Sequence, residues 1–102
     1  MEINVSGHQV DVGSALQDHV KEKLNKLVTK YFAHAIDAHV VFEKQKAFFK
    51  AEIKVHERTK KYAIASAEDT EIYKSFDLAL KKIDVQLRGY KRKLVANHNK
   101  EK

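Results

Sequence analysis

The chain has 102 residues, of which 43% are hydrophobic and 33% charged, and it contains no cysteine. This length corresponds to one domain, and the lack of cysteine excludes disulfides, zinc–thiolate sites and thiol catalysis. No run approaches the roughly 18 apolar residues of a membrane span, and the N-terminal residues 1–4 show no signal-peptide pattern, so we expect a cytoplasmic protein with no membrane partner.

The first predicted elements are a short strand and a helix. Residues 3–5 alternate apolar and polar side chains as a strand does, and residues 7–13 are predicted to form a loop. Ser14 and Gln17 match a capping box, a helix-start motif in which the two side chains satisfy free backbone N–H groups. Apolar residues then recur at helical spacing and predict a helix over about 15–32: Leu16, Val20, Leu24, Leu27, Val28 and Tyr31.

Three strand-like segments follow. Residues 36–44, 48–56 and about 61–67 alternate between two kinds of side chain, and the second segment has the clearest period of two. The links between them, 44–46 and 57–60, are short, which favours antiparallel hairpins. Alanines at every second position of the third segment would let a helix pack close to the sheet.

A second helix is predicted to begin near Asp69 and Thr70. Seven apolar residues step along it by four and three, as one face of a helix requires: Ile72, Phe76, Leu80, Ile83, Leu87, Tyr90 and Leu94. A helix of about 27 residues is about 40 Å long, which is longer than a sheet of short strands is wide. Its C-terminal end is therefore expected to extend beyond the core.

These elements predict an α+β fold with the order β-α-β-β-β-α. The first two strands are expected to be parallel, because a helix connects them, and the last three to form a meander. Both helices should pack on one face of a four-stranded sheet, since the other face is polar: His39, Glu43, Lys50, Glu52, Lys54 and His56. We expect one domain over residues 1–96 and a disordered basic tail over 97–102.

The positive charge lies at one end of the chain. The net charge is +6; residues 1–80 hold 12 basic and 12 acidic side chains, whereas residues 81–102 hold eight basic and two acidic ones. A concentrated basic patch attracts polyanions. The alternative is a solvated helix end, where the helix dipole favours cations, but so large a local excess favours an anionic partner.

The basic residues of the two helices predict an RNA-binding site. Lysines and arginines that neutralise phosphates release condensed counterions, and arginine adds bidentate phosphate recognition. We expect the site to include three lysines on one stripe of the first helix and a cluster on the second: Lys23, Lys26, Lys30, Lys82, Arg88, Lys91, Arg92 and Lys93. A charged outer face is common on any amphipathic helix, and for Lys74 alone that interpretation is favoured.

Other chemistries find little support. His34, Asp37 and His39 are close in sequence, but they span a loop and a strand start, and a metal site there is disfavoured. No nucleophile elbow, P-loop or dinucleotide motif is present. We therefore predict no catalytic residues, no metal and no cofactor.

Two sets of residues together form the pattern of a known family. The first half of the chain contributes Ile3-Asn4-Val5-Ser6-Gly7, Val10, Ala15-Leu16, Lys23-Leu24-Asn25-Lys26-Leu27 and Tyr31-Phe32. The second half contributes Ala65-Ser66-Ala67-Glu68, Tyr73, Asp77, Lys82, Gln86-Leu87, Lys91 and Lys93. Over about residues 1–95 the chain resembles the short-form bacterial ribosome hibernation promoting factor and ribosome-associated inhibitor family, also called the sigma-54 modulation protein family.

The resemblance implies a fold similar to double-stranded RNA-binding domains and a function in silencing ribosomes. Such a protein would bind rRNA in the mRNA and tRNA channel of the small subunit during stationary phase or stress, through the basic residues above. We expect neither a long C-terminal dimerisation domain nor an acidic tail, so the resemblance is to the short type, which is associated with ribosome dimers made with a separate modulation factor. We expect it to be a monomer when free.

One loop departs from the family pattern, because residues 57–61 lack the usual Gly or Asn turn; Arg58, Lys60 and Lys61 there are expected to add contacts. Two alternatives stay open. One is a general structured-RNA or DNA-binding protein that acts off the ribosome. The other is an enzyme or metal protein that depends on His34 and His39.

Overall fold

The computed structural model describes residues 2–31, 35–57 and 62–100, with side chains described except at 35–36, 57 and 90–100. The elements are β1 (Glu2–His8), α1 (Ser14–Tyr31), β2 (Ala35–Gln45), β3 (Phe48–Glu57), β4 (Tyr62–Asp69) and α2 (Ile72–Lys100). The predicted order β-α-β-β-β-α is confirmed.

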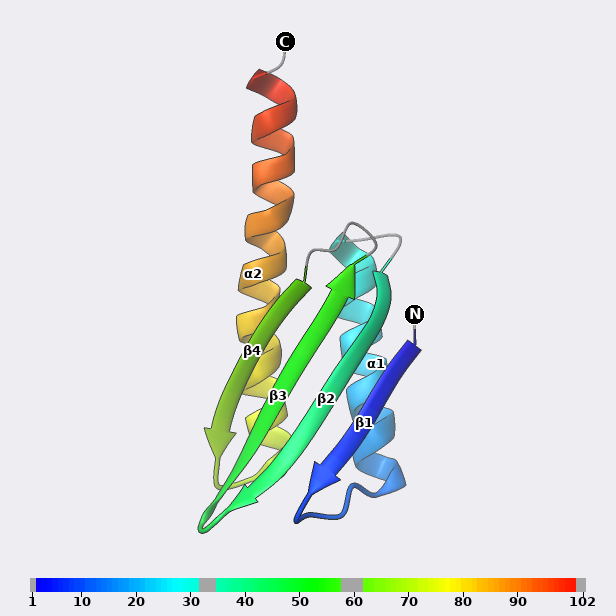
Figure 1. Ribbon diagram of the computed structural model, residues 1–102, viewed down its shortest axis with the longest axis vertical. Coiled ribbons are helices and arrows are strands. Elements are labelled where there is room, and N and C mark those ends of the chain that lie inside the picture. Colours follow the sequence, from blue (N-terminus) through cyan, green and yellow to red (C-terminus); the bar gives the residue numbers. More distant parts are fainter. Residues whose placement is uncertain (1, 32–34, 58–61, 101–102) are drawn as a thin grey trace.

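The four strands form one sheet in the order β1-β2-β3-β4 (Figure 1). β1 and β2 are parallel, with Val5 opposite Val40. β2 and β3, and then β3 and β4, are antiparallel, as their short links predict. β1 and β4 are therefore the edge strands.

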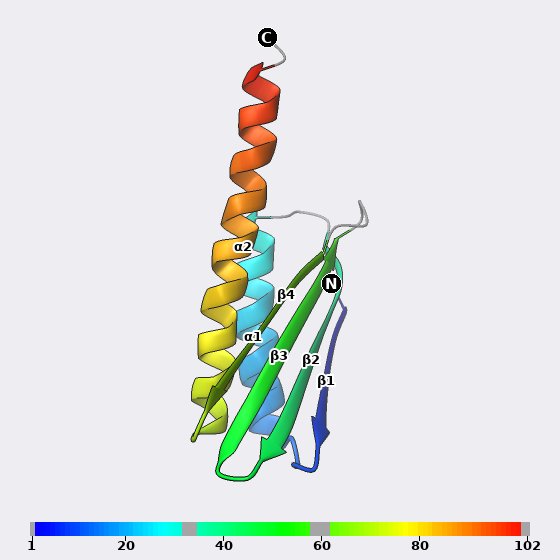
Figure 2. The same cartoon turned by 60° about the vertical axis from the view of Figure 1, so that its left-hand side comes forward.

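Both helices cover the same face of the sheet (Figure 2). Alternate residues of the strands point to that face and are buried, and one side of each helix packs onto them, as the alternation predicts. The core consists of Leu16, Val20, Leu24, Val28, Ala38, Val40, Phe42, Ala51, Ile53, Val55, Ala63, Ala65, Ala67, Phe76, Ala79, Ile83 and Leu87. The three alanines of β4 lie under α2, where small side chains leave room for the helix backbone to approach.

The start of α1 differs from the prediction. β1 continues to His8, which pairs with Glu43, so the loop begins at Gln9 and not at residue 7. The Gly13 carbonyl accepts the first helical bond from Gln17 N (3.0 Å), and Gln17 Nε2 donates to the Val12 carbonyl (3.0 Å). Ser14 is thus already inside the first helical turn, and the capping box predicted from Ser14 and Gln17 is wrong.

The helix α2 is longer than predicted and starts later. The Asp69 carboxylate accepts a hydrogen bond from Glu71 N (2.9 Å), and the Glu71 carbonyl accepts the first helical bond from Ser75 N (3.0 Å). The 29 residues of α2 correspond to about 43 Å, and the molecule is 53 Å along its longest axis. The last turns, drawn in orange to red, extend well past the end of the sheet (Figure 1).

The helix α2 extends into the predicted C-terminal tail. α2 continues through Lys100, past the expected domain boundary at residue 96, and the division into domain and tail stays a prediction. None of the described helices is long and apolar enough to cross a membrane.

Gly7 is needed where the chain leaves β1. A Cβ at this position would lie 2.2 Å from the Val10 carbonyl oxygen and 2.8 Å from Val12 Cγ2. The first neighbour is backbone, so the loop itself would have to move. We expect Gly7→Ala to lower the free energy of unfolding by about 1–3 kcal/mol, as measured by chemical denaturation.

Gly13→Ala is the matched control, because no heavy atom lies within 4 Å of a Cβ added there. It should change stability by less than about 1 kcal/mol. Equal losses in the two variants would contradict the close approach at Gly7.

Candidate nucleic-acid interface

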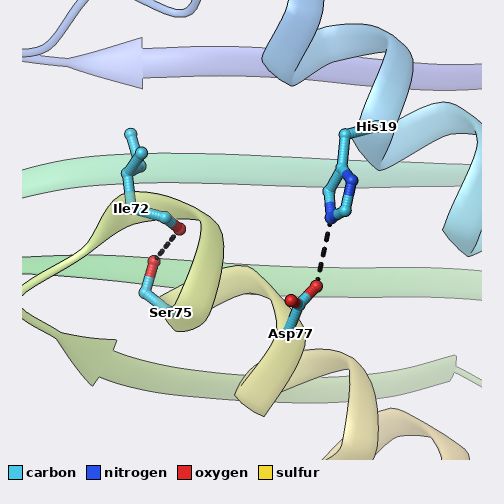
Figure 3. A network of polar contacts seen from close by, with 4 residues as sticks. All are labelled: His19, Ile72, Ser75 and Asp77. Carbon is cyan, nitrogen blue, oxygen red and sulfur yellow. Dashed lines mark hydrogen bonds and ion pairs between the residues drawn. The ribbon is translucent and has the colours of Figure 1, made fainter.

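The three predicted lysines of α1 lie on the side of that helix that is turned toward α2. Lys23, Lys26 and Lys30 are exposed. They follow His19 by four, seven and eleven residues, which places them on the same flank of the helix. His19 Nε2 lies 3.1 Å from Asp77 Oδ1 on α2, and Figure 3 shows the imidazole pointing across to that carboxylate. The lysine stripe therefore borders the line along which the helices meet.

The helices run parallel (Figures 1 and 2), and polar contacts between side chains that the structure describes join them. The first is the contact between His19 and Asp77, where the imidazole also packs edge-on against Tyr73 and Phe76. The second lies near the end of α1, where the Tyr31 hydroxyl donates to Asp84 Oδ1 (2.6 Å). Because both contacts cross the same line, they fix how α1 lies along α2.

A buried serine contributes to the first turn of α2. Ser75 is fully buried, and its hydroxyl donates to the Ile72 carbonyl at 2.6 Å (Figure 3). The hydroxyl therefore has a partner inside the helix and is not a candidate nucleophile.

The second polar contact brings basic groups of both helices together. Arg88 Nη2 donates to Asp84 Oδ2 (3.3 Å), and the Lys30 ammonium lies 5.5 Å from the centre of the Tyr31 ring. The Tyr31 hydroxyl and the Asp84 carboxylate raise the pKa of Arg88 above its usual value. Arg88 therefore lies where the end of α1, which carries Lys30, meets α2.

Lys82 lies on the other side of α2, against the edge of the sheet. Its ammonium donates to the Ser66 carbonyl (2.8 Å), and Gln86 Nε2 donates to the Ile64 carbonyl (2.6 Å). Both carbonyls belong to the edge strand β4, so these side chains protect an edge that would otherwise be free to pair with another strand. The Lys82 side chain is exposed, and because an ammonium has three N–H donors, two of them are left for a ligand. Lys82 does not share a surface with the α1 lysines.

The remaining predicted residues are placed only by their backbone. Lys91, Arg92 and Lys93 belong to α2, in the part of the helix beyond Gly89, and their side chains lie outside those described. Arg58, Lys60 and Lys61 fall outside the described residues altogether.

Lys74 belongs to a local ion pair. Its ammonium lies 2.7 Å from Glu71 Oε2, and the hydrogen bond to Glu71 raises the pKa of Lys74. Its charge is therefore partly compensated within the first turn of α2, which agrees with the structural interpretation preferred for it from the sequence.

The open face of the sheet carries a histidine–aspartate cluster. Asp37 lies 3.4 Å from His39 and 3.5 Å from His56, beside a surface hollow of about 310 Å³ that Lys54 and Tyr62 also line. His56 was not considered with Asp37 from the sequence, because only strand pairing brings them together. Across residues 2–31, 35–57 and 62–100, no group of three His, Asp or Glu side chains has an arrangement that could hold a metal ion, and His34 falls outside these ranges.

A comparison with known families identifies the chain. The family model described as "Sigma 54 modulation protein / S30EA ribosomal protein" matches residues 3–95. The chain belongs to this family. This confirms the resemblance inferred from the sequence.

Two relatives in sequence are named as ribosome hibernation factors. The chain is 34% identical over 99 residues to the "Ribosome hibernation promotion factor" of Rhizobium meliloti, which covers 97% of this chain and 52% of that protein. It is 35% identical over 95 residues to the "Ribosome hibernation promoting factor" of Azotobacter vinelandii, and this match covers 93% of this chain and 87% of that protein. The chain thus spans about half the length of one relative and most of the other.

Two solved structures share the fold of this chain. A ribosomal subunit interface protein from Coxiella burnetii superposes with a TM-score of 0.79 at 26% identity, covering 90% of this chain and 99% of that one. The N-terminal domain of Protein Y from Thermus thermophilus gives 0.80 at 25% identity, with coverages of 88% and 99%. The four-stranded sheet with two helices is therefore the fold of these proteins too.

Proposed function

We propose that the protein is a ribosome hibernation factor. It binds rRNA in the mRNA and tRNA channel of the small subunit and silences translation in stationary phase or stress. The observation that carries the proposal is that relatives covering 93–97% of this chain are named ribosome hibernation factors. The protein acts by binding, without catalysis, and works in the cytoplasm, where ribosomes are. Ribosomes silenced in this way form inactive dimers, together with a separate modulation factor on the same ribosome.

The arrangement of basic residues supports rRNA as the ligand. Lys23, Lys26 and Lys30 border α2, and Arg88 is bonded to Asp84 where the end of α1 meets α2, so cations of two helices can face one partner. The overhanging part of α2, with residues 91–93, extends this basic region away from the core (Figure 1). A protruding cationic helix is suited to a deep channel lined with phosphate, where it contacts several strands at once.

A second candidate is a general structured-RNA or DNA-binding protein that acts off the ribosome. The same basic residues favour it, because contacts with phosphate carry no sequence information. The two functions differ in the relative affinity for two ligands. A hibernation factor binds the folded small subunit much more tightly than a free duplex, whereas a general binder has equal affinity for both.

The test is equilibrium binding of the protein to purified small subunits and to a free RNA duplex at physiological salt. If about five phosphates are neutralised, the logarithm of the affinity should fall with the logarithm of salt concentration with a slope of about −4. Equal affinity for both ligands would favour the second candidate, and a flat salt response would contradict binding through phosphates.

A further inference from the structure

Four side chains form a connected cluster where α1 ends beside α2. The Asp84 carboxylate is at its centre: one oxygen accepts from the Tyr31 hydroxyl (2.6 Å) and the other from Arg88 Nη2 (3.3 Å). The Lys30 ammonium lies over the Tyr31 ring, 5.5 Å from its centre. The Asp84 side chain is 28% exposed and that of Arg88 51% exposed, so the acid lies beneath and the cations lie at the rim.

By charge alone, Asp84 is unfavourable at this place. A carboxylate bonded to Arg88 repels the phosphate that this cation would bind. We attribute the presence of Asp84 to its hold on the Arg88 side chain, which offsets this repulsion. A guanidinium has five N–H donors in a rigid fork, so Arg88 can bond to Asp84 with one edge and present the others to a phosphate without first losing rotamer freedom.

We infer that Asp84 is a positioning residue for RNA backbone phosphate, an inference that rests on the proposed function. It holds Arg88 directly, and through Tyr31 it anchors the end of α1 that carries Lys30, so that a cation from each helix meets the same stretch of ribosomal RNA. The hydrogen bond between Tyr31 and Asp84 keeps the end of α1 in register with α2, and this register sets the spacing of the two cations.

The test is the substitution Asp84→Asn, which keeps the size of the side chain and removes its charge. Positioning and simple electrostatics predict opposite changes in the affinity for purified small subunits. Loss of a negative charge alone should tighten binding, whereas loss of positioning should weaken it by roughly two- to tenfold. Binding to the unstructured polyanion poly(U), which can adapt its own backbone, should be unchanged or tighter.

Two further variants make the comparison specific. The Asp77 carboxylate, on the same helix, contacts His19, which is not a predicted phosphate ligand. Asp77→Asn should therefore not weaken binding to the subunit. Asp84→Glu keeps the charge at i,i+4 spacing from Arg88 and should restore most of the affinity. Either Asn substitution could destabilise the protein, which would lower its thermal unfolding midpoint. The affinities of all variants are therefore compared at a temperature at which every variant is folded.

A double-mutant cycle separates positioning from a general structural role. In an Arg88→Gln background, Asp84→Asn should cause no further loss of subunit affinity, because an asparagine at this position can still accept the Tyr31 hydrogen bond and only the hold on Arg88 is removed. An Asp84→Asn protein that binds small subunits as tightly as the wild type, or one whose loss persists in the Arg88→Gln background, would overturn the inference. If the wild type itself fails to bind small subunits, the proposed function fails and the inference with it.

Discussion

Reversing four charges of α2 should reduce affinity for the small ribosomal subunit by on the order of 10³-fold. The change is Arg88, Lys91, Arg92 and Lys93 to Glu. Each phosphate contact contributes about 0.7–0.9 to the exponent of the salt dependence, which is about fivefold in affinity near 0.15 M salt, so the loss of four contacts multiplies to this size. The measurement is a binding isotherm on purified small subunits, in which the salt slope should also fall from about −4 toward about −1.

The reversal should leave the fold intact, because Glu is a good helix former, residues 91–93 belong to the part of α2 that extends past the sheet (Figure 1), and the Arg88 side chain is half exposed. A matched control reverses four exposed lysines elsewhere: Lys21, Lys44, Lys46 and Lys54. It changes the net charge by the same amount and should weaken binding far less. If the two variants lose equal affinity, net charge and not a site determines binding.

Replacing Phe76 by alanine should cause the largest loss of stability. Phe76 is fully buried, its ring centre lies 6.3 Å from that of Phe42 in the sheet, and it lies 5.7 Å from the imidazole of His19 on α1. It therefore joins the sheet and both helices. A cavity at this junction should lower the free energy of unfolding by about 3–5 kcal/mol, measured by chemical denaturation.

Val85→Ala on the same helix is the control, since Val85 is 64% exposed. It should change stability by less than about 0.5 kcal/mol. A loss below about 1 kcal/mol in Phe76→Ala would mean that the helices do not meet the sheet through this residue.

The fold could be predicted because its residues repeat with clear periods. The alternation in residues 48–56 identifies the buried face of β3, and the steps of three and four along α2 identify its apolar side. The buried side of α2 also includes Ser75 and Ala79, which the pattern of large apolar residues did not include. Small side chains are buried there because the alanines of β4 let the helix come close, and that fit depends on tertiary packing.

The candidate site could be predicted in part. The stripe of Lys23, Lys26 and Lys30 is visible from helical spacing, and the pair of Asp84 and Arg88 could have been found from its i,i+4 separation. The bond from Tyr31 to Asp84 joins residues 53 positions apart, and the bond from Lys82 to a β4 carbonyl depends on how α2 lies along the sheet edge. Neither leaves a signal in local sequence.

The central claim is that the basic residues of the two helices contact the small ribosomal subunit, and lysine acetylation with and without subunits tests it most directly. Acetylation is measured by mass spectrometry. In the bound protein it should be reduced at Lys23, Lys26, Lys30, Lys82, Lys91 and Lys93. Modification at Lys44, Lys46 and Lys54, which lie on β2, β3 and the turn between them, should be unchanged. Protection of these three with full reactivity of the helix lysines would contradict the claim.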